Sequence, residues 1–157
     1  FGLIAYAIML PVVLYRLSVG GLIEDARKPT LAILAAPASL TLAGYLTLEI
    51  SPDPLLVTTL LGIAVLMTVS VYIMLLKLLK LPFSPAFSAF TFPLAISATA
   101  LFKMSLWAEQ TPLFMTYAKY LFAASLAEGV IASAVIVYVL QHYVRFLIAQ
   151  FRAPAAS

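Results

Sequence analysis

The fourth apolar segment of the chain carries a polar pattern that matches one face of an α-helix. The residues recur at intervals of 4, 7 and 4: Ser88, Phe92, Thr99 and Lys103. Polar side chains avoid lipid, so this stripe is expected to face protein or a water-filled path. One alternative is a helix–helix interface in which the hydroxyls bond to their own helix. The other is a pore wall, with Phe92 as a plug and Lys103 favouring anions.

A single carboxylate, Glu128, lies inside the fifth apolar segment. At the centre of a membrane helix it costs about 2.5–3.5 kcal/mol, so Glu128 is expected to face protein or to carry a proton. It is interpreted either as a buried hydrogen-bonding partner or as a proton or ion site. The sequence has no cysteine, one histidine, no phosphate-binding glycine loop and no close carboxylate pair within its apolar segments. We therefore expect no enzyme, no metal site and no cofactor.

The composition places these residues in a membrane protein. Of the 157 residues, 64% are hydrophobic and 10% are charged, with a mean hydropathy of +1.11. Soluble domains are about 45–50% apolar and about 25% charged, so a soluble fold could not cover this surface. The high apolar and low charged fractions exclude nucleic-acid-binding modules and cytosolic enzymes. They make the lipid bilayer the expected environment of the chain.

Five apolar segments are expected to form membrane helices, giving an all-α polytopic fold. The fifth, at 1.5 Å per residue, reaches about 58 Å and exceeds the roughly 30 Å hydrocarbon core. The fourth begins with Ser84 as a hydroxyl cap and Pro85 at the first helical position. The expected helices cover residues of about 1–17, 30–48, 55–80, 85–106 and 113–150.

The second and fourth segments each contain a proline, Pro37 and Pro93, followed by small and hydroxyl residues. A proline in mid-helix removes a backbone hydrogen bond and kinks the helix. We expect these two helices to be kinked and inner, with uniformly apolar outer partners. A kink that only improves packing is the simpler alternative.

Basic residues predict the orientation of the spans. Lys103 and Lys119 fall on one side, together with Glu49, Asp53 and Glu109. The other side is expected to be cytoplasmic and to hold the C-terminus. It receives the remaining basic residues: Arg16, Arg27, Lys28, Lys77, Lys80, Arg145 and Arg152. Asp53, between two prolines, is interpreted as a solvated loop residue.

Two runs resemble a known family. Residues 28–39 (KPTLAILAAPAS) resemble the seventh helix of the tellurite-resistance/dicarboxylate transporter (TDT) family, whose members include bacterial TehA-like proteins and slow anion channels of plant guard cells. Residues 82–94 (PFSPAFSAFTFPL) are similar to its ninth helix, in which an aromatic-Thr-Phe-Pro pattern carries a gating phenylalanine. The gate maps to Phe92, with Phe90 as the nearest competitor.

The resemblance implies ten helices in five hairpins around a central pore, homotrimeric assembly and a bacterial inner membrane location. It covers the chain as helices six to ten, the C-terminal half, so a longer protein is expected. That expectation agrees with a first span that starts outside without an initiator methionine. Pore-lining positions are then Ser39, Ser88, Thr99 and Lys103.

The resulting expectation is passive permeation of small inorganic or organic anions through a pore gated by Phe92, with a family link to tellurite resistance. The alternative is a proton-coupled secondary transporter of C4-dicarboxylates or oxyanions, with Glu128 as its candidate proton site. A third interpretation, a membrane scaffold without transport, requires the stripe to be dry packing. No nucleic-acid partner is expected.

Overall fold

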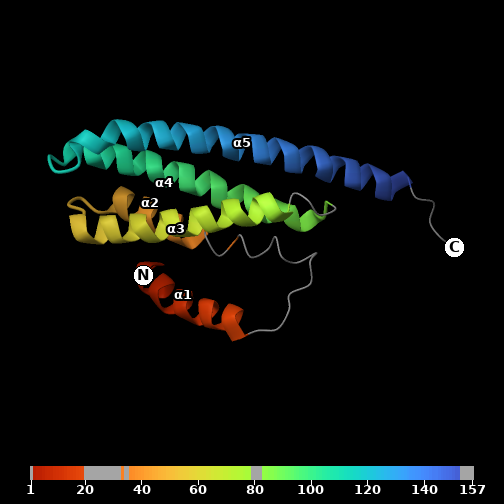
Figure 1. Ribbon diagram of the computed structural model, residues 1–157, viewed down its shortest axis with the longest axis horizontal. Coiled ribbons are helices and arrows are strands. Elements are labelled where there is room, and N and C mark those ends of the chain that lie inside the picture. Colours follow the sequence, from red (N-terminus) through yellow and green to blue (C-terminus); the bar gives the residue numbers. More distant parts are fainter. Residues whose placement is uncertain (1, 20–32, 34–35, 79–82, 153–157) are drawn as a thin grey trace.

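The computed structural model describes residues 2–19, 33, 36–78 and 83–152, and in these ranges it contains helices and no strand. The basic residues Arg27, Lys28 and Lys80 lie outside the described residues, as does the first part of the expected second helix. The elements, coloured along the chain in Figure 1, are α1 (Gly2–Val19), α2 (Ala36–Leu48), α3 (Pro54–Leu78), the 3₁₀ helix η2 (Pro85–Phe90), α4 (Thr91–Gln110) and α5 (Met115–Arg152).

Three stretches of the described chain are long and apolar enough to cross a membrane. They cover Pro54–Lys77, Pro85–Gln110 and Met115–Phe151, with mean hydropathies of 2.3, 1.4 and 2.0. Such runs need about 20 apolar residues to span the hydrocarbon core. The predicted all-α polytopic membrane fold is confirmed.

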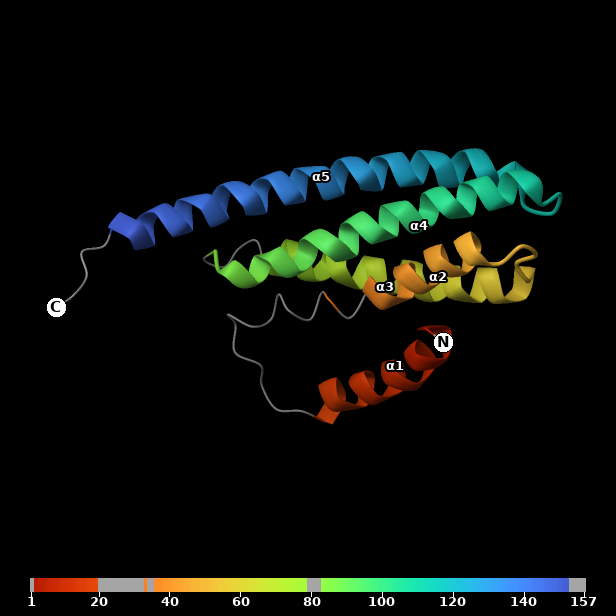
Figure 2. The same ribbon diagram turned by 180° about the vertical axis from the view of Figure 1, so that it is seen from behind.

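Helix α4 is the central element of the fold. It packs along α5 and against α2, while α1 contacts α2 on the far side from α5 (Figures 1 and 2). The buried side of α4 contributes Leu94 to one apolar cluster with α3, η2 and α5, and Ala100 and Met104 to a second cluster with α2 and α3. Because α2, α3, η2 and α5 all contact α4, its rotation decides which of its residues are buried.

The turn between α2 and α3 is fixed by hydrogen bonds. Asp53 Oδ1 accepts a bond of 2.8 Å from the Leu56 backbone N–H, and the Asp53 N–H donates to the Tyr45 hydroxyl at 3.0 Å. Pro54 follows as the first residue of α3, so Asp53 is an N-cap. The prediction of Asp53 as a solvated loop residue therefore missed its capping role.

The two prolines that were expected to kink helices lie early in α2 and α4. Pro37 is the second residue of α2, and residues 34–35 before it are outside the described residues. Pro93 is the third residue of α4, but η2 and α4 follow each other without a break from Pro85 to Gln110, so Pro93 lies within a continuous helical stretch at a change of helix type. The kinks at Pro37 and Pro93 stay predictions.

The start of η2 also differs in detail from the prediction. Ser84 precedes Pro85 as expected, but its hydroxyl makes no capping bond and is buried without a partner among the described residues. A 3₁₀ helix closes i to i+3 hydrogen bonds and brings poorer geometry than an α-helix. The segment before Phe92 is therefore wound more tightly than the α-helix that follows it.

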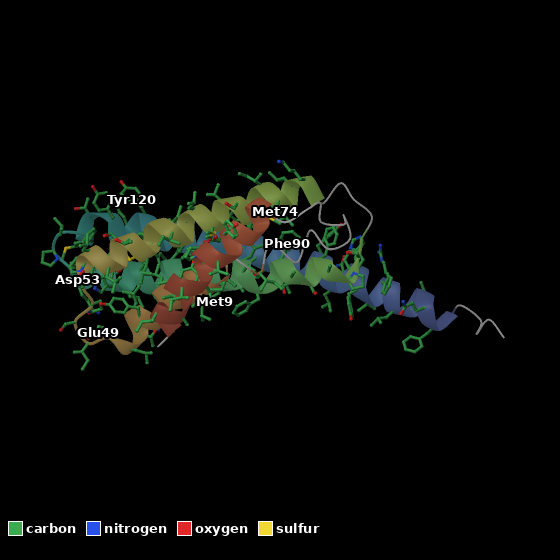
Figure 3. All side chains as sticks on the ribbon, turned by 90° about the horizontal axis from the view of Figure 1, so that it is seen from below. Met9, Glu49, Asp53, Met74, Phe90 and Tyr120 are labelled. Atoms are coloured by element: carbon green, nitrogen blue, oxygen red, sulfur yellow. The ribbon has the colours of Figure 1, made fainter. Side chains whose placement is uncertain are left out.

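The two ends of the helical assembly carry different charges. Figure 3 shows Glu49, Asp53 and Tyr120 together at one end, while α5 extends beyond the other helices at the opposite end. The 38 residues of α5 span about 57 Å, which is close to the expected length of about 58 Å. Lys77 and Arg145 lie toward that opposite end on α3 and α5. The side chains of Arg16 and Arg152 are outside the described residues.

Candidate functional site: the two sides of α4

The predicted stripe occupies the outward side of η2 and α4. Phe92 is 53% exposed, Ser88 and Thr99 are exposed, and Lys103 is half-buried. At 100° per residue, Thr99 and Lys103 lie within about 20° of Phe92 around the α4 axis. The structure thus brings Phe92, Thr99 and Lys103 onto one face of α4 that no other described helix covers. Ser88 is also exposed, but the 3₁₀ winding of η2 turns it by about 80–100° from Phe92.

The hydroxyls of the stripe are satisfied within their own helices. Ser88 Oγ donates to the Pro85 carbonyl at 2.9 Å, and Thr99 Oγ1 donates to the Ala95 carbonyl at 3.0 Å. Such bonds to the preceding turn are common for serine and threonine in membrane helices. Each oxygen retains an acceptor lone pair, so the face can still receive hydrogen bonds from water.

The two candidate gate residues have opposite environments. Phe90 is 0% exposed and packs in the cluster with Leu94 and Ala132, its ring 6.1 Å from that of Phe87. Phe92, two residues later, turns its ring away from this cluster and remains 53% exposed. Phe90 therefore anchors η2 to α5, whereas Phe92 belongs to the open stripe.

The opposite side of α4 holds a buried polar cluster. Ser97 lies about 140° around the helix from Phe92 and donates from Oγ to Glu128 Oε1 at 2.8 Å. Tyr72 of α3 donates its hydroxyl proton to the same Oε1 at 3.3 Å. Glu128 is 6% exposed. The carboxyl group thus joins α3, α4 and α5, as the interpretation of Glu128 as a buried hydrogen-bonding partner predicts.

The Ser97 hydroxyl also lies 2.9 Å from the Leu94 carbonyl. A hydroxyl has one proton and two lone pairs, so it donates to one oxygen at a time. Donation to Glu128 Oε1 matches an ionised carboxyl, because that group only accepts. Donation to Leu94 leaves Ser97 Oγ free to accept from a protonated carboxyl. The cluster can accommodate both protonation states without moving a helix.

A cavity of about 310 Å³ adjoins this cluster. Its polar lining consists of Ser39, Thr68, Tyr72, Ser97 and Glu128, and the remainder is aliphatic. Ser39, which was predicted as a pore-lining residue, is 1% exposed and lies at this cavity. The cause is the rotation of α2, which turns Ala38, Ser39 and Leu42 toward α4.

Sequence reasoning did not find Tyr72 and Ser97 as partners of Glu128. They stand 56 and 31 residues before it, so no local spacing connects them. Tyr72 lies in a segment that was interpreted as uniformly apolar. A carboxylate within a membrane helix needs hydrogen-bond donors, and this requirement was the one indication in the sequence that Glu128 has partners on other helices.

A row of aromatic rings connects the far part of α5 to η2. His142 stacks on Tyr138 with ring centroids 4.2 Å apart and lies 5.3 Å from Phe83, which lies 5.5 Å from Phe87. His142 Nδ1 is 2.9 Å from the Tyr138 carbonyl, so this nitrogen carries the proton. In the described part of the chain, no three histidine or acidic side chains are grouped so that they could hold a metal ion.

The fold and the site together define a polytopic helical membrane protein with one polar face of α4 left open. The chain belongs to the voltage-dependent anion channel family, SLAC1, whose family model matches residues 1–147. Comparison with curated proteins gave no match, and comparison with solved structures gave none either. Membership assigns the chain to a channel and transporter family that moves anions across membranes, and the predicted family relationship is confirmed at this level.

Proposed function

We propose that the chain forms part of the wall of an anion-conducting pore and that Phe92 is its gate. The observation that carries the proposal is the exposed ring of Phe92 on an open face of α4 that also carries Thr99 and Lys103. An aromatic ring in a narrow path resists ions, because they cannot shed their water there. Lys103, 11 residues farther along α4, adds a positive potential that favours anions.

The proposal includes the assembly that the resemblance implies. The chain would supply the C-terminal half, helices six to ten, of a TehA-like protein with ten helices in five hairpins. Three such proteins would form a homotrimer in a bacterial inner membrane, with the C-terminus in the cytoplasm and a role in tellurite resistance. The separation of Glu49 and Asp53 from Lys77 and Arg145 at opposite ends supports this orientation.

Ion currents in oocytes that express the complete protein test the gate. Phe92→Ala is expected to raise the resting anion current at least tenfold, because it removes the ring that blocks the path. Phe102→Ala is the matched control: Phe102 is 40% exposed on the same helix but lies about 80° from the stripe. Equal currents in the wild type and in Phe92→Ala would remove Phe92 from the gate.

One observation favours the alternative of a proton-coupled transporter of C4-dicarboxylates or oxyanions. Glu128 is a buried carboxyl whose partners fit both protonation states. In that mechanism Glu128→Gln abolishes flux driven by a proton gradient. In the channel mechanism the current reverses at the anion equilibrium potential at every pH, and Glu128→Gln still conducts. Glu128 faces away from the stripe, which favours the channel.

A further inference from the structure

The cavity beside Glu128 opens between α3 and α5. Its floor comes from α2 and α4, including Leu42 and Ala100, and the rims of the opening are apolar side chains of the two outer helices. Val65, Val69 and Ile131 on these rims are 43–47% exposed. The uncovered rim is apolar, so a ligand that enters the cavity here passes between aliphatic side chains of α3 and α5. The cavity lies on the opposite side of α4 from the proposed pore.

The charge of the cavity is negative when Glu128 is ionised. Glu128 is the carboxylate among its lining residues, and the lining contains no lysine, arginine or histidine. Both hydrogen bonds to the carboxyl group end on Oε1. Within the described residues, Oε2 receives no hydrogen bond from a side chain or the backbone. A carboxylate oxygen without a donor from the protein, in a site with a mostly apolar lining, favours a cation or a proton.

We propose that this cavity binds a small lipophilic amine in its ammonium form, with Glu128 Oε2 as the counter-charge. An ammonium group supplies the donors that Oε2 lacks within the described residues. The aliphatic lining accommodates the apolar body of the amine. The volume of about 310 Å³ is at the lower end of small-molecule sites, so the ligand is small.

Proton transfer makes entry from lipid feasible. A neutral amine crosses the hydrocarbon and meets the protonated carboxyl. The O–H bond at Oε2 then breaks as an N–H bond forms, and the electron pair of that O–H bond stays on oxygen. The product is an ammonium–carboxylate ion pair with no net charge, so the membrane holds no uncompensated ion. Ser97 can switch its own proton from Leu94 to Glu128 as the carboxyl ionises.

Glu128 is 13 residues beyond the start of α5, or about 20 Å along the helix. Tyr72, its partner on α3, is six residues before Leu78 at the end of that helix, or about 9 Å. The ammonium headgroup of a lipid has the same charge as the amine and lies near that end, so the test below includes a membrane that carries such headgroups. This site is independent of the proposed gate at Phe92.

Calorimetric titration of the protein in phosphatidylcholine nanodiscs tests the site, with empty nanodiscs as the blank. The probe is 2-phenylethylamine at pH 7, and the neutral isostere 2-phenylethanol reports apolar binding alone. The wild type is expected to bind the amine saturably, and Glu128→Gln is expected to weaken that binding at least tenfold. Binding of 2-phenylethanol should change less than twofold.

Two phenylalanine substitutions on α5, at Ala127 and Ala123, locate the binding site without changing the carboxyl group. Ala127→Phe fills the cavity and is expected to weaken amine binding at least tenfold. Ala123→Phe, one turn earlier on α5 and not part of the lining, should bind as the wild type does. Any of three results overturns the proposal. These are no saturable binding above the blank, equal amine affinity in the wild type and Glu128→Gln, or equal amine affinity in Ala127→Phe and Ala123→Phe. Loss of amine binding in phosphatidylethanolamine nanodiscs would assign the cavity to that headgroup and overturn it too.

Discussion

The two sides of α4 carry similar residue types that differ in exposure and in hydrogen-bond partners. On the stripe, Thr99 is exposed and bonds to its own helix, whereas on the buried side Ser97 bonds to Glu128 of another helix. The same contrast separates the phenylalanines, because Phe90 is packed and Phe92 is open. The difference lies in rotation about the helix axis and not in residue type. The buried side holds the helices together, whereas no other described helix covers the open side.

The phenylalanine pair gives the largest expected difference between the two sides. Phe90→Ala leaves a hole of roughly 100 Å³, which at about 24 cal/mol per Å³ costs about 2 kcal/mol. The usual transfer term is small here, because lipid is as apolar as the protein interior. Phe92→Ala is expected to cost less than about 0.5 kcal/mol, as its ring is half exposed. Thermal unfolding in detergent micelles measures both.

The opposite ranking, with Phe92→Ala the less stable variant, would show that the stripe is covered by packing. The scaffold interpretation without transport would then gain support. A small loss for both variants would show instead that the cluster around Phe90 relaxes to fill the hole.

The hydroxyl pair gives a smaller difference. Ser97→Ala removes one of the two donors to Glu128 and is expected to cost about 1 kcal/mol, since interhelical hydrogen bonds in membranes average about 0.6 and reach about 1.7 kcal/mol. Thr99→Ala removes a bond within one helix and is expected to change stability by less than about 0.3 kcal/mol. The same unfolding assay compares them. Equal losses would contradict the separation of the two sides.

Lys103 gives the smallest expected effect. Lys103→Glu reverses a charge near the end of the stripe and is expected to lower anion current about twofold at low salt, because it repels anions from the mouth. The effect should fade at high ionic strength, where the screening length falls to about 3 Å. Lys119→Glu, on the exposed side of α5, is the matched control. An unchanged current at low salt would move Lys103 away from the path.

Part of this arrangement follows from the sequence. Long apolar runs predicted an all-helical membrane protein, since few other folds satisfy the backbone in lipid. The intervals between Ser88, Phe92 and Thr99 predicted a single stripe, because 3.6 residues per turn is a local property. The resemblance around Phe92 indicated the family that the comparison then confirmed.

Other features depend on how the helices pack. Glu128 was recognised as needing partners, but Tyr72 and Ser97 become its donors only through the rotation of α3 and α4. Ser39 faces the cavity for the same reason. Pro93 was expected to kink a helix. A 3₁₀ segment precedes Pro93, and the residue pattern of that segment did not predict this helix type. Local periodicity fixes which residues share a face, and packing fixes what each face meets.

The tight winding of η2 couples the aim of Phe92 to the buried carboxyl group. A 3₁₀ helix turns 120° per residue and rises about 2.0 Å, against about 100° and 1.5 Å for an α-helix. If the six residues of η2 rewound as an α-helix, their ends would rotate by about 120° and approach by about 3 Å. A change in the winding of η2 therefore becomes a rotation and a shortening directly before Phe92. If Phe87 stayed in its cluster during such a change, the helix beyond it would turn, so Phe92 and Ser97 would rotate together and the Ser97–Glu128 bond would break.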